Sequence, residues 1–563
     1  MTPEYTTSMP DWESRLEHGL SIVPKPIFPD QAEVALGVFK RLVAVDVPGS
    51  PTYGEISPPW VFDFVAAVFG AYNIETGERL IKEFFCMVPK KSGKSAIASG
   101  IMLTFLILNW RKSAQFIIVS PTIQVADNSF KPSMDSVRAD PQLSQLIQVS
   151  AHTRTLTHRV TGATLKVLAA DGDTVTGSKA SVMLADETHV LGTKPQAAQM
   201  LREAMGGLAA RPEGCIIKIS TQSSQPPAGV FKEDLQLFRD IRDGVVVDKR
   251  RFGVLYEHPR AWIEDGRART LQGMKIVNPS LGYSVDYNFL EDQFQRAERI
   301  GGEQFLDFMS KHANLEIGLN LASDRFAGAA FWEQNADASL TLDTLIERCD
   351  VAVVGIDGGG LDDMLGLSVV GRCKLTRKWL SWSHAWVHTI ALERRKDIAS
   401  RLRDFEKDGD LTIVPLPGED VQQLCEYVQR LESSGLLPEK NAIGVDPAGI
   451  TAIVDMLTGD EYGIAIERIV AVSQGYRLSG AIKTLERALA GGTLVHSKQP
   501  LMDWCLGNAK IEVKGSAVYV TKAASGTAKI DPLAALFNAV SLIALNPSGR
   551  GTLDGWLSSL KNN

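Results

Sequence analysis

The stretch MVPKKSGKSAIASG, residues 87–100, decides the fold of the N-terminal half of this chain. An apolar run, KEFFCMV (82–88), leads into a short loop, and a helical stretch follows it. In such a junction, the loop N–H groups and the helix N-terminus face a nucleotide phosphate, a lysine reaches the β- and γ-phosphates, and a serine binds Mg²⁺. The residues predicted to bind ATP here are Pro89, Lys90, Lys91, Ser92, Gly93, Lys94 and Ser95.

The loop departs from the usual phosphate-binding pattern at its first position. That pattern begins with a Gly five positions before Gly93, where this chain has Val88. A Gly-Lys-Ser triplet also occurs by chance, so an ordinary strand–turn–helix junction with a surface lysine is the alternative. A second motif of acidic residues separates the two interpretations.

That second motif is ASVMLADETHV, residues 180–190, in which an apolar strand ends in Asp186 and Glu187. An acid at the carboxyl end of a strand can hold the Mg²⁺ shell, and the next acid can activate the attacking water as a general base. Acids are also common at helix N-termini, which is the structural alternative. The pairing of this motif with the Gly-Lys-Ser loop favours ATP hydrolysis.

Polar residues also follow the next apolar run, CIIKIS (215–220). Thr221, Gln222 and Ser223 can sense the γ-phosphate from this position, or can simply cap the loop. Short apolar runs alternate with helical stretches from residue 81 to about 225, and again from residue 351. Buried parallel strands separated by helices have this pattern, so the sequence predicts an α/β fold.

In the second block, three aspartates stand at the ends or beginnings of elements. Asp357 ends VAVVGID, Asp446 ends NAIGVD, and Asp531 opens DPLAALFNAVSLIAL. Carboxylates that converge in this way hold two divalent cations, Mg²⁺ or Mn²⁺, about 3.5–4 Å apart for phosphodiester cleavage. Asp362 and Asp363 lie nearby and can contribute. Ordinary helix capping and strand-end acids remain the alternative.

The bulk composition limits the possible classes of protein. A chain of 563 residues exceeds what one hydrophobic core supports, so two or more domains are expected. The six cysteines are scattered without a Cys-x-x-Cys pair, which argues against a zinc site and a disulfide scaffold. No apolar stretch is long enough for a membrane span. The net charge of −7 indicates that any contacts with DNA are local.

The order of these motifs resembles that of the large terminase subunits of tailed bacteriophages. The similarity spans roughly residues 55–545 and rests on segments found in the same order. The matching segments are VPKKSGKS, LADETH, ISTQSS, VNPSLG, VVGIDGGGLDDMLGL, AIGVDPAG, SQGYRLSGAIKTLERALAGG, WCLGNAK and KIDPLAAL.

The resemblance implies an additional-strand P-loop ATPase followed by a ribonuclease H-like nuclease. The boundaries expected on this basis are an extension at 1–55, a motor domain at 56–257, a linker at 258–345, a nuclease at 346–548 and a flexible tail at 549–563. It further implies that Asp186 binds Mg²⁺ and that Glu187 is the catalytic base. Ser220, Thr221 and Gln222 would couple hydrolysis to movement, and Asp357, Asp446 and Asp531 would hold two Mg²⁺ or Mn²⁺ ions.

Two family features are not evident in the sequence. Many members carry an aromatic–Gln pair that reads adenine, whereas here Trp60 is followed by Val61. Ring motors also use an arginine finger on the γ-phosphate, and Arg154, Arg202 and Arg211 are all candidates.

The function expected from the resemblance is ATP-driven packaging of double-stranded DNA into a capsid, with cutting of concatemeric DNA. The implied partners are a portal protein, a small terminase subunit and further copies of the chain in a ring. The implied location is the host cytoplasm, transiently on the procapsid. The alternatives are a helicase–nuclease of repair or replication, although no second motor lobe is evident after residue 225, and a non-catalytic DNA-binding scaffold.

Overall fold

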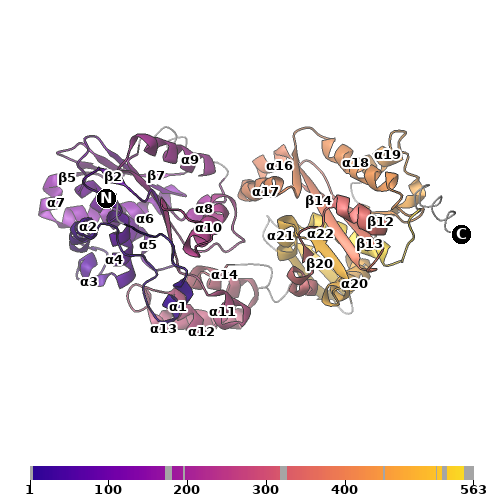
Figure 1. Ribbon diagram of the computed structural model, residues 1–563, viewed down its shortest axis with the longest axis horizontal. Coiled ribbons are helices and arrows are strands. Elements are labelled where there is room, and N and C mark those ends of the chain that lie inside the picture. Colours follow the sequence, from indigo (N-terminus) through magenta and orange to yellow (C-terminus); the bar gives the residue numbers. More distant parts are fainter. Residues whose placement is uncertain are drawn as a thin grey trace. The chain divides into compact units, whose positions relative to one another are not determined.

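The chain forms two compact units, Met1–Ile317 and Gly318–Asn563, each with its own sheet (Figure 1). The division falls inside the segment 258–345 that the sequence suggests as a linker. Of the expected flexible tail, only residues 549 and 550 are described. The computed structural model describes residues 4–170, 180–194, 197–316, 326–447, 451–514, 517–522 and 529–550.

The first unit is built on a sheet with the strand order β10-β3-β9-β8-β4-β7-β6-β5. Strands from β10 to β7 pair in parallel, whereas β6 and β5 are antiparallel. This confirms the predicted α/β architecture. The strands are β3 (Glu83–Met87), β4 (Gln115–Ser120), β5 (Ile147–Ser150), β6 (Thr155–His158), β7 (Thr164–Ala169), β8 (Val182–Asp186), β9 (Cys215–Ser220) and β10 (Arg251–Leu255), with β1 (Tyr72–Asn73) and β2 (Glu78–Arg79) forming a separate ribbon.

Helices cover both faces of this sheet, so its central strands are buried on both sides. Successive residues of β3 point to opposite faces: Phe84 packs with α4 and α5, and Phe85 packs with α10. The helices are α1 (Trp12–Glu17), α2 (Pro29–Arg41), α3 (Tyr53–Ile56), α4 (Pro59–Phe69), α5 (Lys94–Ile107), α6 (Ile123–Ala139), α7 (Pro141–Leu146), α8 (Thr188–Leu191), α9 (Ala197–Gly207), α10 (Gly229–Arg242), α11 (Arg260–Glu264), α12 (Leu271–Val277), α13 (Tyr287–Ile300) and α14 (Gly302–Ala313).

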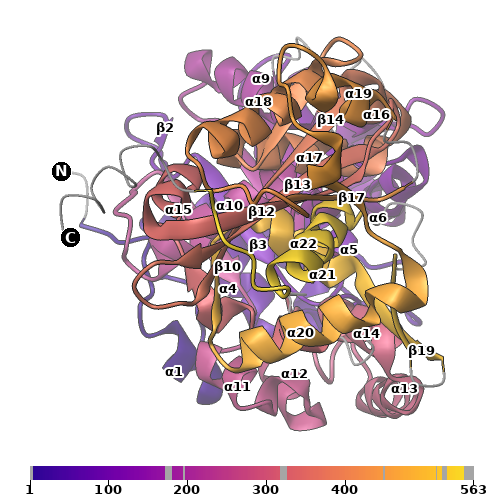
Figure 2. The same cartoon turned by 90° about the vertical axis from the view of Figure 1, so that its right-hand side faces the viewer.

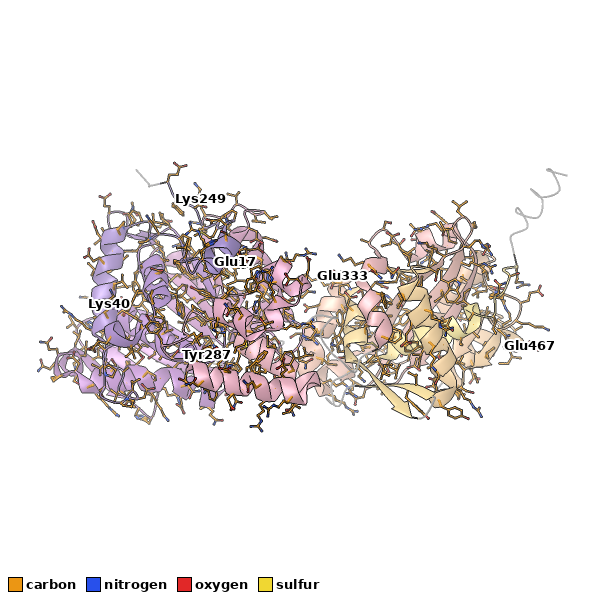
Figure 3. The ribbon with its side chains drawn as sticks, turned by 90° about the horizontal axis from the view of Figure 1, so that it is seen from below. Glu17, Lys40, Lys249, Tyr287, Glu333 and Glu467 are labelled. Atoms are coloured by element: carbon orange, nitrogen blue, oxygen red, sulfur yellow. The ribbon has the colours of Figure 1, made fainter. Side chains whose placement is uncertain are left out.

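The N-terminal segment is attached to the first unit by specific contacts. The Tyr5 hydroxyl donates to the carbonyl oxygen of Lys249 at 3.0 Å. The guanidinium of Arg242 lies 3.7 Å from the ring centroid of Trp12. The indole N–H of Trp262 donates at 2.8 Å to Glu17, which is labelled in Figure 3, and this bond joins α1 to α11. These contacts connect the predicted N-terminal extension with α10, with the segment before β10 and with α11.

The second unit has a mixed sheet with the strand order β11-β18-β14-β13-β12-β16-β17, and β15 pairs with β14. Three long antiparallel strands, β12 to β14, are followed by β16 and β17, which run parallel to β12. This order is the one expected of a ribonuclease H-like sheet. The strands are β11 (Ala336–Asp337), β12 (Cys349–Gly358), β13 (Met364–Cys373), β14 (Trp379–His388), β15 (Leu411–Val414), β16 (Ile443–Val445), β17 (Ile469–Ala471) and β18 (Leu494–Ser497), with a hairpin of β19 (Ala509–Lys514) and β20 (Ala517–Lys522).

Helices also cover both faces of the second sheet. One face packs against α20 and α22, and the other against α15, α18 and α19. Figure 2 shows α22 against β12 and β13. The helices are α15 (Leu342–Arg348), α16 (Thr389–Arg394), α17 (Lys396–Asp408), α18 (Glu419–Ser433), α19 (Thr451–Thr458), α20 (Ser479–Ala490), α21 (Pro500–Asn508) and α22 (Asp531–Ile543).

Two expectations from composition can be compared with the structure. All six cysteines are buried and none forms a disulfide. Within the described segments, no helix is long and apolar enough to cross a membrane.

Three glycines let α22 lie directly on the strands of the second unit. A Cβ added to Gly355 of β12 would lie 1.9 Å from the carbonyl oxygen of Ala535. One added to Gly366 of β13 would lie 2.6 Å from the nitrogen of Pro532, and one added to Gly444 of β16 would lie 3.2 Å from the Asn538 carbonyl oxygen. The helix backbone therefore occupies the space that side chains would fill at these positions.

We predict that Gly355→Ala displaces α22 and destabilises it by about 1–3 kcal/mol, the usual effect of overpacking a core. Hydrogen exchange of the amides at 531–543 should then accelerate by roughly 5- to 150-fold. Gly480→Ala in α20 is the control, because a Cβ there meets no atom within 4 Å. Equal exchange rates in α22 for both variants would contradict this account of the packing.

Candidate functional site

The phosphate loop joins the end of β3 to the start of α5. Gly93 has a φ of 77° and Lys91 a φ of 74°, which is the left-handed region that turns the chain tightly. Val88 is buried, and its N–H donates to the Ser220 carbonyl oxygen at 3.1 Å. Its φ is not positive. The first position of this loop therefore continues the strand, and the missing Gly leaves the loop geometry intact.

Lys94 and Ser95 begin α5 beside the acidic end of β8. The Ser95 hydroxyl donates to Asp186 Oδ2 at 3.2 Å, and the Ser129 hydroxyl of α6 donates to the same oxygen at 3.0 Å. The Lys94 ammonium is buried, and this burial lowers its pKa, although the charges of Glu187 and Asp186 oppose the shift. The lysine, the serine and the aspartate thus meet where the sequence predicts the nucleotide phosphates and Mg²⁺.

Glu187 is held in a strained conformation next to Asp186, with a φ of 54°. Non-glycine residues in this region are often found at functional sites. Its Oε2 lies 3.2 Å from His189 Nδ1. Burial raises the pKa of Glu187, but the hydrogen bond with His189 and the charge of Lys94 outweigh it and bring the pKa to about 2. An ionised carboxylate at this position can accept a proton from water.

The pKa of the neighbouring Asp186 moves in the opposite direction. Burial and the negative charge of Glu187 raise it to about 6. Two adjacent carboxyl groups with separated pKa values have separate roles, because one favours a proton or a cation while the other stays ionised. This fits the roles suggested for them by the sequence, metal ligand for Asp186 and base for Glu187.

The segment suggested for coupling, Ser220 to Gln222, is buried at the end of β9. The Ser220 hydroxyl accepts the backbone N–H of His189 at 3.0 Å and lies 3.2 Å from the His189 ring nitrogen. His189 therefore connects the Glu187 carboxylate with this segment. The sequence gives only a weak signal for this residue, its position two places after Glu187.

Several buried polar atoms around the loop lack a hydrogen-bond partner within the described part of the chain. They come from a hydroxyl of the loop, from the last residue of β8, from a residue just after β8 and from one after β9: Ser92 Oγ, Asp186 Oδ1, Thr188 Oγ1 and Gln222 Nε2. Buried polar groups are normally paired, so these atoms fit a site that binds a polar ligand. Oxygen acceptors suit Mg²⁺, and hydroxyl and amide donors suit phosphate oxygens.

Residues after position 257 form hydrogen bonds to the phosphate loop and to the segment after β9. The Ser284 hydroxyl donates to the Lys91 carbonyl oxygen at 2.9 Å, and the Lys90 N–H donates to the Lys311 carbonyl oxygen at 2.7 Å. Asn314 accepts the Gln222 N–H at 3.1 Å and donates to the Tyr256 carbonyl oxygen at 2.9 Å. Sequence reasoning missed these residues, because their partners are backbone groups far away in the chain.

The structure assigns structural partners to two of the uncertain residues. The buried Trp60 donates its indole N–H to Ser280 at 3.0 Å. Arg154 binds both carboxylate oxygens of Asp127, at 2.5 and 3.2 Å. Arg202 is exposed on α9, and Arg211 is partly buried before β9. The identity of an arginine finger therefore stays open among these candidates.

The three aspartates of the second unit lie at one edge of its sheet. The register pairs Ile356 with Val445, so Asp357 and Asp446 are the next neighbours on parallel strands, and the Asp446 N–H donates to the Ile356 carbonyl oxygen at 3.3 Å. Asp531 is buried at the start of α22. A Cβ built on Gly358, the residue after Asp357, would lie 3.2 Å from the Cβ of Asp531.

The same edge carries further charged and polar groups. Arg395 lies 3.3 Å from Asp362, and the buried Lys529 forms an ion pair with Asp363. In the described segments, no group of three or more His, Cys, Asp or Glu side chains is already arranged to hold a metal ion. The backbone thus brings the three predicted carboxylates to one edge, and their role as metal ligands stays a prediction.

Asn538 organises this edge and was not predicted from the sequence. Its amide donates to the Ile356 carbonyl oxygen at 2.9 Å and accepts from Gln474 at 3.0 Å. The sequence carries one signal of this close packing, a Gly-x-Asp motif that occurs twice: Gly355 to Asp357 in β12, and Gly444 to Asp446 at the end of β16. Each Gly lets α22 approach, and each Asp follows two residues later.

Comparisons with known proteins show which family this chain resembles. Residues 59–226 match the family model described as "Terminase large subunit, ATPase domain". The chain is 22% identical over 501 residues to "Terminase, large subunit" of Enterobacteria phage HK97, covering 87% of this chain and 89% of that protein. It is 22% identical over 476 residues to "Terminase large subunit" of Lactococcus phage p2, covering 82% of each.

A bacterial protein and a solved structure are also similar. "Protein YmfN" of Escherichia coli (strain K12) is 24% identical over 342 residues, which is 59% of this chain and 70% of that protein. The crystal structure of the HK97 bacteriophage large terminase aligns with a TM-score of 0.48 and 18% identity, covering 91% of this chain and 99% of that one.

We predict that Ser129→Ala weakens Mg²⁺ binding, because the Ser129 hydroxyl orients Asp186. The Mg²⁺ concentration for half-maximal ATP hydrolysis should rise roughly tenfold, as is typical when a partner of a metal ligand is lost. Ser133→Ala is the matched control, since Ser133 lies one turn further along α6, is also buried and bonds Ser99 instead. A similar Mg²⁺ dependence in both variants would show that Ser129 does not support the metal site.

Proposed function

Because the chain belongs to the large terminase subunits of tailed bacteriophages, ATPases of phage DNA packaging, we propose that it drives double-stranded DNA into a capsid and cuts concatemeric DNA. In this proposal it works as a ring of identical subunits on a portal protein, and a small terminase subunit delivers the DNA. Its site of action is the host cytoplasm and, transiently, the procapsid.

The observation that carries the proposal is the connected set at the ends of β3, β8 and β9. Ser95 bonds Asp186, Glu187 contacts His189, and His189 contacts Ser220. A lysine on the phosphates, a buried metal-binding carboxylate and an ionised base are the parts that nucleotide hydrolysis requires. The residues proposed for these parts are Lys94, at the start of α5 after β3, and Asp186 and Glu187, at the end of β8 in the same sheet.

In the proposed hydrolysis step, the loop N–H groups and Lys94 bind the β- and γ-phosphates of ATP. Ser95 and Asp186 would hold Mg²⁺, which would supply positive charge to neutralise the phosphates. Glu187 accepts a proton from the attacking water. The contact with His189 holds the Glu187 carboxylate in place and helps to lower its pKa, so the carboxylate stays ionised.

Coupling to movement follows from the contacts of the same base. The Ser220–Gln222 segment forms hydrogen bonds to His189 at one end and to Asn314 at the other. In this proposal, the departure of the γ-phosphate changes the contacts of Glu187 and His189, and His189 passes the change to the segment. A shift in this segment therefore reaches both the end of β8 and the end of α14. We propose that this shift changes the grip on DNA.

The proposed cutting activity belongs to the second unit. Asp357, Asp446 and Asp531 offer only oxygen ligands, which suit Mg²⁺ or Mn²⁺. A pair of such ions would activate the attacking water and stabilise the leaving oxygen of the phosphodiester. The tight packing of α22 on β12 and β16 supports this, because it brings Asp531 to the strand ends.

We predict that the two activities separate by mutation. Lys94→Ala should lower ATP hydrolysis at least 100-fold, because it removes an electrostatic contact to the transferring phosphoryl group, and should leave metal-dependent DNA nicking unchanged. Asp357→Ala should abolish nicking and keep ATP hydrolysis. Both activities can be measured on the full chain with plasmid DNA.

Lys112→Ala, at an exposed lysine after α5, is the control for the loss of a positive charge. The ATPase assignment fails if Lys94→Ala hydrolyses ATP at the rate of the Lys112→Ala variant. The nuclease assignment fails if nicking survives in Asp357→Ala.

A further inference from the structure

An exposed segment follows β17 at the edge that carries the three aspartates. β17 runs parallel to β16, with Val445 paired to Ala471, and the Val472 N–H donates to the Val445 carbonyl oxygen at 2.8 Å. Because carboxyl ends of parallel strands share one edge, residues 473–477 emerge beside Asp446. The proposed function does not use this segment.

Tyr476 and Arg477 form a preorganised pair in this segment. The Tyr476 side chain is 56% exposed, and the Arg477 guanidinium lies 5.6 Å from its ring centroid. Arg477 also donates to the Tyr476 hydroxyl at 3.1 Å and to the Ser473 hydroxyl at 3.5 Å. Within the described ranges, no carboxylate lies within ion-pair distance of Arg477, so its charge is available to a ligand.

Two side-chain amides, a half-buried one and a buried one, fix the segment to the carboxylate edge. Gln474 donates to the Asn538 side-chain oxygen at 3.0 Å, and Asn538 donates to the carbonyl oxygen of Ile356 at 2.9 Å. Ile356 directly precedes Asp357 in β12. The fully buried Asn538 side chain thus links the segment that carries Tyr476 and Arg477 to the strand that carries Asp357 through two hydrogen bonds.

We propose that Ser473–Arg477 is a DNA-strand contact, in which Arg477 binds a backbone phosphate and Tyr476 stacks on a base or sugar next to the scissile bond. The proposal rests on the nuclease function of the second unit. Guanidinium groups bind phosphates with good geometry, and exposed aromatic rings stack on bases of any sequence.

The charge balance of the molecule favours DNA as the occupant. The net charge of the chain is −7, so DNA contacts beyond the proposed metal ions need local cations at this edge. Nearby cations are engaged, since Lys529 pairs with Asp363 and Arg395 with Asp362. Arg477, by contrast, has no carboxylate within ion-pair distance among the described residues.

The first test measures metal-dependent cleavage of a short duplex by the full chain. Arg477→Ala should raise KM roughly tenfold with a smaller change in kcat, and Arg477→Lys should recover part of the loss. Lys378→Ala is the control, because this exposed lysine lies in the β13–β14 turn at the opposite end of the strands and changes the net charge equally. An unchanged KM in Arg477→Ala would overturn the proposal.

The second test measures contact without cleavage. DNA that carries 5-iodouracil is irradiated with the full chain in EDTA, and the cross-linked peptide is identified by mass spectrometry. A cross-link at Tyr476 that is lost in Tyr476→Ala supports the proposal, and a cross-link pattern that is the same in wild type and Tyr476→Ala overturns it. Both side chains are exposed, and a thermal melt of each variant confirms folding.

These tests separate the inference from the nuclease assignment. If the wild-type chain cross-links through Tyr476 but cuts no DNA with Mg²⁺ or Mn²⁺, the nuclease function fails while the DNA contact stands. If it cuts DNA and both variants match the wild type in KM and in cross-linking, the nuclease function stands and the contact is wrong.

Discussion

Parallel pairing of neighbouring strands is the constraint on which both candidate sites depend. In the first unit, β8 and β9 are registered so that Asp186 pairs with Ile219, which brings Glu187 and Ser220 to the same edge. In the second unit, the pairing of Ile356 with Val445 does the same for Asp357 and Asp446. Because parallel strands end on one side, residues far apart in the chain become neighbours without any contact of their own.

In the second unit, close packing of a helix adds a third carboxylate to the two at the strand ends. The glycines of β12, β13 and β16 leave room for the backbone of α22, whose first residue is Asp531. The first unit uses a helix differently, because the N-terminus of α5 itself carries Lys94 and Ser95. In both units a buried helix end therefore delivers side chains to the strand ends.

Polar contacts tie each site to elements outside the sheet. In the first unit, Asn314 and Ser284 bond backbone groups of the Gln222 and Lys91 loops. In the second, Asn538 joins β12 to the segment after β17. Buried amides have few alternative partners, so such bonds fix the relative positions of the loops they connect.

The sequence by itself determined the α/β class and the positions of Lys94, Asp186, Glu187 and Asp357 at or next to the ends of elements, because apolar runs that end in polar residues are local patterns. It missed the antiparallel strands β5 and β6, because these four-residue segments, IQVS and TLTH, mix apolar with polar residues and form no continuous apolar run.

Only the tertiary structure decided which of these residues meet. It brought the Ser129 hydroxyl to Asp186 and the His189 ring to Glu187. It also positioned Asn538 between β12 and the segment after β17. No spacing in the chain encodes these contacts, because they depend on strand register and on how closely helices approach the sheets.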